Sequence, residues 1–524
     1  MDLRGIDMPY NASNQFIDEN IKSGLEDKTA LYYEGGQVTY GMLQDRVNQA
    51  ANMFNEIGLE MEDRVVITCY DSPEFIYSFF GGIRTGVVPI PVNTMMQPHD
   101  YEYYLNNSRA KSLIIHETLW RQISHLRKRF VFLKHVIVIL EGAGELSDDT
   151  LDFQQLLDSQ DIDFQSPYTG YDDSAFWLYS SGTTGEPKGV IHLQHDMEVS
   201  TNNYAKKVLK MTENDRCLSA SKLFFAYGLG GGMYFPLGAK GSTILVKERT
   251  TPEIMFQTIE KYKPTIFFGV PTLFGAMIEY AEQSRESFDL SSVRICASAG
   301  ESLPPFFAKR WKELFGLNIL DGIGSTEALH IFISNRMDDI KEGSSGKIVP
   351  GYEAKIVNEQ GIELPPNEIG DLVISGCSIA NGYWNMHEEN KQKFVGKWLN
   401  TGDKYYMDED GYFWYCGRAD DMLKVGGIWV SPNEIENCLL NHEAVLEAAV
   451  VGDTNENNLV IPKAYIVLKK DVVPSDQLGE DIQQFVKGKL AGYKYPRVIQ
   501  FIDELPKTAT GKIQRYRLRE LVSS

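Results

Sequence analysis

Residues 179–189 combine glycines, hydroxyl side chains and a lysine in the run Tyr-Ser-Ser-Gly-Thr-Thr-Gly-Glu-Pro-Lys-Gly. The two inner glycines, Gly182 and Gly185, open backbone conformations in which N–H groups converge on an anion. Lys188 adds a positive charge, and hydroxyl donors come from Ser180, Ser181, Thr183 and Thr184. Because Gly185 is followed by Glu-Pro-Lys, the spacing differs from a Walker A loop. The run predicts a phosphate-binding loop, and a flexible turn is the weaker interpretation.

Four later motifs carry the charged groups that chemistry on a phosphate requires. They are Gly-Ser-Thr-Glu at 324–327, Thr-Gly-Asp at 401–403, Gly-Arg-Ala-Asp-Asp-Met-Leu-Lys at 417–424 and Pro-Lys-Thr-Ala-Thr-Gly-Lys at 506–512. The Glu327 carboxylate can ligate Mg²⁺, the Asp403 carboxylate can accept two hydrogen bonds, and Lys512 supplies a compact charge. Taken singly, each motif also has a plain structural interpretation, as a helix cap, a turn or a solvated lysine.

In this order along the chain, the loop and the four motifs resemble the signature of the AMP-forming acyl/aryl-CoA synthetase, adenylation-domain and luciferase superfamily. The resemblance spans nearly the whole chain and implies a reaction in two steps. A carboxylate attacks the α-phosphorus of ATP and pyrophosphate leaves, and the thiol of coenzyme A then displaces AMP from the acyl-adenylate. Positioning and charge neutralisation dominate the first step, because two anions must meet. The implied cofactors and co-substrates are ATP, Mg²⁺ and coenzyme A.

The resemblance assigns roles to individual residues. Lys512 is expected to contact the attacking carboxylate and the α-phosphate, Thr326 to donate its hydroxyl to the α-phosphate, and Glu327 to hold Mg²⁺. Ile323 stands where many members have a tyrosine against adenine, so its contact there would be apolar. The implied ATP- and AMP-binding residues are Ser180, Ser181, Gly182, Thr183, Thr184, Gly185, Lys188, Gly300, Glu301, Asp321, Gly322, Ile323, Thr326, Asp403 and Arg418.

A small C-terminal domain is expected to rotate between the two steps. By resemblance, Asp420 is the hinge of this rotation, which delivers the motif lysine for adenylation and then builds a tunnel for coenzyme A. Gly426 and Gly427 would line the path of the thiol arm, because absent side chains allow close approach. Asp403 and Arg418 would bind the hydroxyls of the ribose.

Two segments, residues 222–229 and 324–332, resemble those of benzoate:CoA ligases within the superfamily. A small aromatic lining suits a planar ring and leaves little room for a long chain, although ordinary core packing is the alternative for these aromatic residues. Such a pocket separates methyl-sized changes by only about 1–3 kcal/mol, so benzoate is not distinguished from fluoro-, amino- or hydroxybenzoates. The implied acyl pocket consists of Phe225, Ala226, Tyr227, Gly324, His330 and Ile331.

Apolar runs alternate with amphipathic segments over the first 170 residues, and similar units follow up to residue 296, which predicts parallel α/β layers. After about residue 345, short alternating strands with Gly-rich turns predict an antiparallel sheet or small β-barrel. From about residue 420 a compact α+β segment begins. The expected fold class is therefore α/β. With the resemblance, residues 1–419 are expected to form an adenylate-forming domain of two layered subdomains plus a small β-barrel, and residues 420–524 a mobile α+β lid. The apolar runs lie at 64–69, 86–92, 111–115, 135–140, 241–246, 265–268 and 293–296.

Composition narrows the class of protein. The chain has 524 residues, 43% hydrophobic and 23% charged, which fits a multidomain globular protein. Its net charge of −21 argues against a nucleic-acid partner. No run reads as a membrane helix and no cysteine pair has zinc spacing. Six scattered cysteines and the lack of an apolar leader predict reduced thiols and a cytoplasmic location.

The expected partners are small molecules, namely an aryl carboxylate, ATP and coenzyme A, with a homodimer as a further expectation. Two other functions remain open at this point. The first is a stand-alone aryl-acid adenylation enzyme that loads a carrier-protein phosphopantetheine. The second is a nucleotide-binding protein without turnover. The thiol acceptor and the formation of AMP distinguish the three functions.

Overall fold

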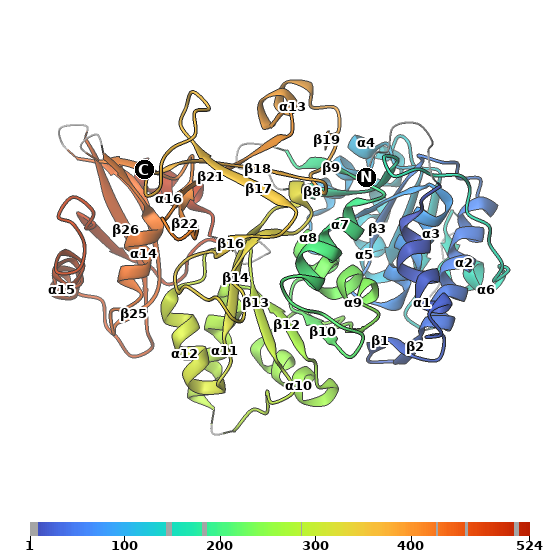
Figure 1. Ribbon diagram of the computed structural model, residues 1–524, viewed down its shortest axis with the longest axis horizontal. Helices are drawn as coiled ribbons and strands as arrows, with labels where there is room; N and C mark the ends of the chain where they lie inside the picture. Colours follow the sequence, from blue (N-terminus) through green and yellow to red (C-terminus); the bar gives the residue numbers. More distant parts are fainter. Residues whose placement is uncertain are drawn as a thin grey trace.

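A computed structural model describes residues 9–142, 149–180, 186–284, 286–425, 428–455, 459–507 and 513–523, with backbone alone for 428, 429, 522 and 523. The C-terminal strands β25 and β26 lie at the left of Figure 1, away from the first sheet around β3 at the right. Between them lie a second, larger sheet and an antiparallel region below α13.

The first sheet is parallel and follows the order β4-β3-β5-β6-β7. Its central strands are apolar and buried because helices cover the sheet, as in other parallel sheets. The four predicted apolar runs of this region are confirmed as strands. The bounds are β3 (Arg64–Thr68), β4 (Val88–Pro91), β5 (Ser112–His116), β6 (His135–Ile139) and β7 (Leu151–Asp152), with helices α2 (Tyr40–Glu56), α3 (Pro73–Thr85), α4 (Pro98–Ser108) and α5 (Glu117–Ile123).

The second sheet follows the order β16-β15-β14-β13-β12-β10-β11-β1-β2. Its middle strands are parallel, while β15, β16 and β2 run antiparallel to their neighbours. The parallel strands end on one edge, which is where the next loops gather. The bounds are β1 (Thr29–Tyr33), β2 (Gly36–Thr39), β10 (Arg216–Ser219), β11 (Ser242–Ile244), β12 (Ile266–Gly269), β13 (Ile295–Ser298), β14 (Ile319–Gly324), β15 (Ile331–Ser334) and β16 (Lys347–Ile348), with α10 (Pro252–Tyr262), α11 (Pro271–Gln283) and α12 (Pro305–Phe315).

Antiparallel strands dominate residues 350–418, as the alternating pattern predicts. In the described residues they form a sheet of order β17-β18-β21-β20 with β22 beside β21, and a separate sheet of order β19-β9-β8. The second of these joins the paired strands β8 and β9 to β19, a segment almost 200 positions later in the chain. The bounds are β8 (Ser174–Ser180), β9 (Lys188–Leu193), β17 (Tyr352–Val357), β18 (Gly370–Gly376), β19 (Gly382–Tyr383), β20 (Phe394–Val395), β21 (Trp398–Met407) and β22 (Phe413–Arg418), with α13 (His387–Lys393).

The C-terminal segment has its own hydrophobic clusters. Their described members all follow residue 422, whereas the buried members of the other clusters all precede residue 414. Ser431 caps its first helix by accepting a hydrogen bond from the Glu434 N–H (3.2 Å), as the Ser-Pro-Asn-Glu sequence predicts. The bounds are β23 (Leu423–Val425), β24 (Ile428–Val430), α14 (Pro432–Leu439), β25 (Val445–Thr454), β26 (Val460–Leu468), α15 (Asp476–Lys487), β27 (Val498–Phe501) and α16 (Arg515–Ser523).

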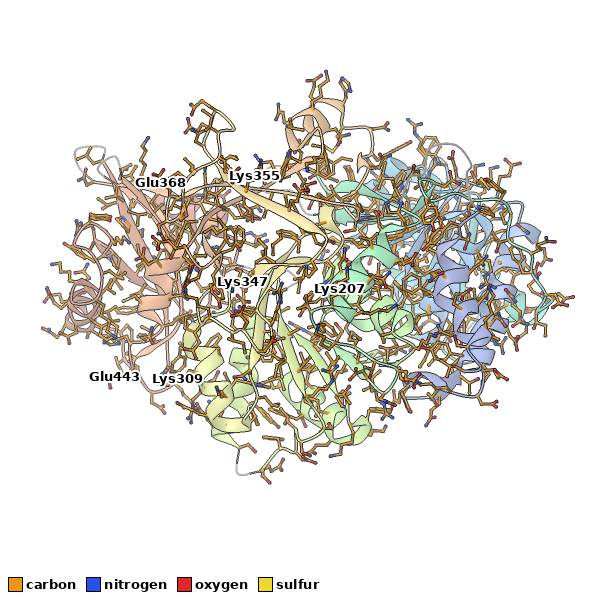
Figure 2. All side chains as sticks on the ribbon, in the orientation of Figure 1. Lys207, Lys309, Lys347, Lys355, Glu368 and Glu443 are labelled. Carbon is orange, nitrogen blue, oxygen red and sulfur yellow. The ribbon has the colours of Figure 1, made fainter. Side chains whose placement is uncertain are left out.

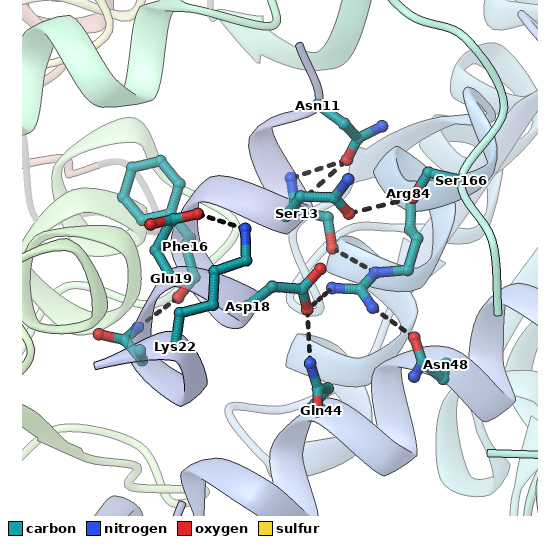
Figure 3. A network of polar contacts seen from close by, with 12 residues as sticks. Asn11, Ser13, Phe16, Asp18, Glu19, Lys22, Gln44, Asn48, Arg84 and Ser166 are labelled. Atoms are coloured by element: carbon teal, nitrogen blue, oxygen red, sulfur yellow. Dashed lines mark hydrogen bonds and ion pairs between the residues drawn. The ribbon is translucent and has the colours of Figure 1, made fainter. Parts of the chain in front are cut away.

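A buried polar network anchors the N-terminal helices η1 (Asn14–Asp18) and α1 (Glu19–Lys22) on α2 and α3 (Figure 3). The Arg84 guanidinium, whose side chain is 2% exposed, pairs with the Asp18 carboxylate at 2.6 Å. It also donates to the Ser13 hydroxyl at 3.1 Å and to the Asn48 side-chain oxygen. Burial lowers the pKa of Arg84, and the neighbouring Asp18 counteracts that shift. Each charged group in the network has its partner inside the protein.

Charged side chains elsewhere project from the surface, as Figure 2 shows for Lys355 and Glu368. Some form exposed ion pairs, such as Lys355 with Glu363 at 3.4 Å. Pairs of this kind contribute little to stability. In the described part of the chain, no helix has the length and apolar character needed to cross a membrane.

Candidate active site

A cavity of about 480 Å³ opens beyond the carboxyl ends of β10, β12, β13 and β14. In sheets with parallel strands, ligands bind at this edge because the loops that follow the strands converge there. The segments just after these strands contribute Ala220, Val270 and Ala299 to the wall. Each residue of the predicted acyl pocket lines this cavity, as do three predicted nucleotide residues: Phe225, Ala226, Tyr227, Gly324, His330, Ile331, Gly300, Glu301 and Thr326.

The floor of the cavity is aromatic. The ring centroids of Tyr227 and His330 lie 5.3 Å apart, and those of Phe224 and Phe225 lie 4.6 Å apart. The Tyr227 hydroxyl donates to the Ala297 carbonyl at 3.0 Å, and His330 Nε2 donates to the Tyr227 carbonyl at 3.1 Å. Burial lowers the pKa of His330 to about 3, so its ring is neutral. Hydrogen bonds therefore hold this aromatic part of the lining in place, and its histidine is neutral, whereas Lys222, Arg249 and Glu301 line other parts of the cavity.

Close packing of glycines fixes the position of His330. A Cβ on Gly230 would lie 2.4 Å from His330 Cδ2, and a Cβ on Gly324 would lie 2.6 Å from the His330 carbonyl oxygen. Real Cβ contacts do not reach these distances, so a larger residue at either position would displace the histidine. The sequence motifs did not indicate several other wall residues, namely Val270, Thr272, Ala276, Ala299 and Leu329.

The Gly-Ser-Thr-Glu motif forms a tight turn at the edge of this cavity. Residues Thr326–Ala328 make the short helix η5, whose cap is the Ser325 hydroxyl accepting from the Ala328 N–H at 3.2 Å. The next residue, Leu329, has a φ of 69°, an unfavourable conformation for a residue with a side chain. Thr326 lines the cavity, whereas Glu327 does not line it and contacts Tyr383 instead.

The Glu327 carboxylate is held by a residue that the motifs did not indicate. The Tyr383 hydroxyl, on β19, donates to Glu327 Oε1 at 2.8 Å. Burial and the nearby Glu327 charge raise the pKa of Tyr383. Among the described residues, no hydrogen bond or ion pair involves Glu327 Oε2. That oxygen fits the hard oxygen ligation that Mg²⁺ prefers.

A buried histidine and aspartate hold the same turn from behind. His192, on β9, donates from Nε2 to the Thr326 carbonyl at 2.8 Å, and its Nδ1 lies 2.8 Å from Asp196 Oδ2. Both side chains are fully buried. The strand that follows the phosphate-binding loop is thereby joined to the Thr326–Glu327 turn.

The predicted ribose residues face each other across two strands. Asp403 on β21 pairs in register with Arg418 on β22, and Arg418 Nη1 donates to Asp403 Oδ1 at 2.9 Å. Gly402 adopts a φ of 79°, which a residue with a Cβ rarely takes. The Asp403 and Thr401 side chains point inward and are buried. Burial alone would lower the pKa of Arg418, but the Asp403 carboxylate raises it.

The predicted phosphate-binding loop lies between β8 and β9 in the chain, as expected for a run that follows an apolar strand. Ser180 and Lys188 pair in register at the base of the hairpin. Lys188 forms an ion pair with Glu389 of α13, and its Nζ lies 5.3 Å from the centroid of the Tyr383 ring. Ser181, Gly182, Thr183, Thr184 and Gly185 lie outside the described residues, as do Lys512, Gly426 and Gly427.

The predicted adenine-side residues occupy adjacent strand ends. Gly300, with a φ of 98°, follows β13, and Asp321, Gly322 and Ile323 end β14. Burial raises the pKa of Asp321 well above its ordinary value, despite the backbone N–H groups of Leu303 and Gly322. Within the described chain, Asp321 Oδ1 has no hydrogen-bond partner. This buried oxygen is suited to accept a hydrogen bond from a ligand amine.

The predicted hinge residue lies between the two sets of hydrophobic clusters. Asp420 follows β22, and its carbonyl oxygen accepts a hydrogen bond from Arg519 Nη1 at 3.3 Å. Its neighbour Asp421 pairs with the same guanidinium at 2.8 Å. Across the two parts of the chain, Asn433 donates to the Ser302 hydroxyl at 3.3 Å. The boundary at residue 419 stays a prediction.

Comparison with known proteins gives consistent results. A family profile described as AMP-binding enzyme matches residues 18–384, and one described as AMP-binding enzyme C-terminal domain matches residues 434–512. The benzoate--CoA ligase of Thauera aromatica is 45% identical over 97% of this chain and 96% of its own.

Two solved structures share the fold over essentially the full length. The anthranilate CoA ligase AuaEII in complex with anthranoyl-AMP has a TM-score of 0.94 at 40% identity, covering 100% of this chain and 99% of its own. A benzoate CoA ligase from Burkholderia xenovorans LB400 has a TM-score of 0.89 at 40% identity, covering 97% of this chain and 100% of its own. The predicted fold class, with a large N-terminal and a small C-terminal domain, is confirmed.

Proposed function

Since the chain belongs to the AMP-binding enzyme family, we propose that it is an AMP-forming acid:CoA ligase whose acid is benzoate or a close relative. The reaction converts ATP, the acid and coenzyme A into AMP, pyrophosphate and the acyl-CoA. One observation carries the choice of acid. The cavity of about 480 Å³ is lined by Phe225, Tyr227 and the neutral His330, and Thr326 also lines it, so a ring bound there would present its carboxylate to Thr326.

The site residues divide into two groups, one for the acid and one for the nucleotide. The acid occupies the aromatic cavity, and the nucleotide lies along Asp321, Asp403 and Arg418. Glu327 would hold Mg²⁺ through its available oxygen, and the metal would supply charge neutralisation at the phosphates. The Thr326 hydroxyl lies at the boundary, where the carboxylate and the α-phosphate must meet.

The two steps are the same as those that the motifs imply. An oxygen of the carboxylate forms a bond to the α-phosphorus while the bond to pyrophosphate breaks. The sulfur of coenzyme A then forms a bond to the acyl carbon, and AMP leaves with the oxygen that joined them. Lys512 supplies the cation for the first step, and Gly426 and Gly427 line the path of the thiol in the second.

Rotation of the C-terminal domain about Asp420 is part of the proposal. The separation of hydrophobic clusters on either side of residues 414–422 supports it, because few core contacts resist such a motion. Asp420→Pro is expected to spare adenylation and slow overall turnover. Unaltered overall turnover in this variant would remove the hinge role.

An acid panel tests the proposal. AMP release is measured with MgATP and coenzyme A across benzoate, fluoro-, amino- and hydroxybenzoates, cyclohexanecarboxylate and short fatty acids. We expect the highest kcat/KM with benzoate or a small substituted benzoate. A preference for fatty acids would overturn the assignment of the cavity, and activity only with a carrier-protein phosphopantetheine would replace coenzyme A as acceptor.

A homodimer and a cytoplasmic location complete the proposal. The six cysteines, all within the described residues, are free thiols, and five of them are buried. Light scattering of the purified protein tests the dimer, and cell fractionation tests the location. A monomer at micromolar concentration would exclude a stable dimer.

A further inference from the structure

Helix α13 places Lys393 close to the predicted nucleotide residues, where Lys188 already supplies one positive charge. The helix projects at the top of Figure 1, and Lys393 is its last residue. A Cβ placed on Gly402 would lie 3.2 Å from Lys393 Nζ and 3.2 Å from Arg418 Nη2. The ammonium of Lys393 therefore lies beside the Thr-Gly-Asp turn, close to the guanidinium of Arg418.

The charges around Lys393 are those of the predicted nucleotide site. Burial lowers the pKa of this lysine most, the Glu327 and Asp403 carboxylates raise it, and Arg418 and Lys188 lower it further. All four charged groups therefore lie near its ammonium. Residues from four separate segments (188, 327, 403 and 418) converge here, and α13 places Lys393 among them.

The carboxylates near Lys393 already have closer partners. Asp403 accepts from Arg418 at 2.9 Å, and Glu327 accepts from Tyr383 at 2.8 Å. Lys188 pairs with Glu389, one turn earlier on α13. In the part of the chain that is described, no carboxylate lies within 4 Å of the Lys393 ammonium. A cation removed from water without a partner is costly, so this position favours an anionic ligand.

We propose that Lys393 binds the triphosphate of ATP and the pyrophosphate that leaves. The inference rests on the proposed function, because it requires the nucleotide to lie along Asp403 and Arg418. The ligand class follows from the surroundings of Lys393. Lys188 of the predicted phosphate-binding loop and Glu327, the expected Mg²⁺ ligand, both lie near its ammonium. A cation between these two groups would contact the phosphates of ATP rather than the adenine base. When the bond between the α-phosphorus and the bridging oxygen breaks, the electron pair moves to pyrophosphate. The ammonium of Lys393 stabilises that added charge.

The test compares Lys393→Met with Lys391→Met on the same helix. Lys391 is a matched control because its side chain is 62% exposed and its nearest carboxylate, Glu388, lies 3.8 Å away. Calorimetry measures the Kd of MgATP, magnesium pyrophosphate and AMP for each variant. A charge-assisted hydrogen bond of this kind corresponds to about a ten- to hundredfold change in affinity.

We expect Lys393→Met to weaken MgATP and pyrophosphate by this factor, with AMP changed less than threefold and with Lys391→Met unchanged throughout. Lys393→Arg should recover part of the loss, which also covers the case in which the methionine variant does not fold. Equal losses for AMP and ATP would show a structural role and overturn the inference, as would a Lys393→Met variant that binds ATP like the control. Failure of the proposed function looks different, because the wild-type protein would then form no acyl-adenylate.

Discussion

Arg84 is a fully buried cation and Lys393 a partly buried one, and their surroundings differ in one further respect. The Arg84 guanidinium has a carboxylate, a hydroxyl and an amide oxygen around it, all from the protein itself. The ammonium of Lys393 lies beside another cation, and the nearby carboxylates are bonded to other groups. Removal of a buried cation that has internal partners destabilises the fold, whereas a cation without such partners is a candidate for ligand binding.

Removal of the paired cation should produce the largest effect on stability. Arg84→Met removes the cation that pairs with the partly buried Asp18 carboxylate and that donates to the buried Ser13 and Asn48 side chains, so the free energy of unfolding should fall by about 3–5 kcal/mol. Activity per folded molecule should not change. Arg121→Met is the control, since this side chain is 71% exposed and pairs with Glu117 along one helix. Denaturant unfolding measures the free energy of unfolding of both variants. A loss below about 1 kcal/mol for Arg84→Met would show that the buried Arg84 contributes no more than an exposed ion pair and would contradict its structural role.

Lys512 extends the comparison to a cation brought from the C-terminal domain. Lys512→Ala should slow adenylate formation by roughly two to three orders of magnitude, because a preorganised positive charge is lost from the first step. Reaction of preformed benzoyl-adenylate with coenzyme A should persist. Lys507→Ala is the control, since Lys507 is paired with Glu447 at 2.6 Å. Equal loss of both half-reactions would show that Lys512 does not act specifically in adenylation.

His330 is a buried group that must stay uncharged, so it should make stability depend on pH. The unfolded chain binds this proton near pH 6.5, and the folded protein excludes it until about pH 3. Stability contributed by the neutral ring is therefore complete above pH 6.5 and falls as the pH drops. The expected loss is about 2 kcal/mol between pH 7 and pH 5. His330→Leu should flatten this part of the curve, whereas replacement of His99, whose side chain is 80% exposed, should not.

Glu389 gives the smallest expected effect. Its ion pair with Lys188 competes with phosphate for that lysine, and its side chain is 38% exposed. Because such exposed pairs contribute only about 0.2–1 kcal/mol, Glu389→Gln should lower the KM for ATP two- to threefold. Glu388→Gln, at an 80% exposed position, should leave KM unchanged. An increase in KM with Glu389→Gln would mean that Glu389 orients Lys188 for phosphate binding and does not compete with phosphate for it.

Much of the fold follows from local patterns in the sequence. The apolar runs around residues 64–69 and 135–140 are long and β-branched enough to identify strands, and Ser431 identifies a helix start through its cap. The loop after β8 could be located because glycines and hydroxyl residues follow an apolar strand directly. These signals act within a few residues, so tertiary structure is not needed to recognise them.

The remaining site residues depend on contacts between distant segments. Tyr383 reaches Glu327 only because β19 pairs with β9. His192, on β9, reaches Thr326 because the same small sheet packs against the turn at residues 326–328. Lys393 ends a short polar helix, His-Glu-Glu-Asn-Lys-Gln-Lys, whose composition is that of a solvated surface turn. No local pattern distinguishes such residues from ordinary surface or core positions. The arrangement of the strands decides their environment.

Transfer of an isotopic label tests the central claim most directly, namely that the aromatic cavity and the Thr326 turn join an aryl carboxylate to the α-phosphate. Benzoate carrying ¹⁸O in both carboxylate oxygens is incubated with the protein, MgATP and coenzyme A, and the products are examined by mass spectrometry. The account predicts one labelled oxygen in AMP and one in benzoyl-CoA. Benzoyl-CoA formed while AMP stays unlabelled, or label found in inorganic phosphate, would contradict it.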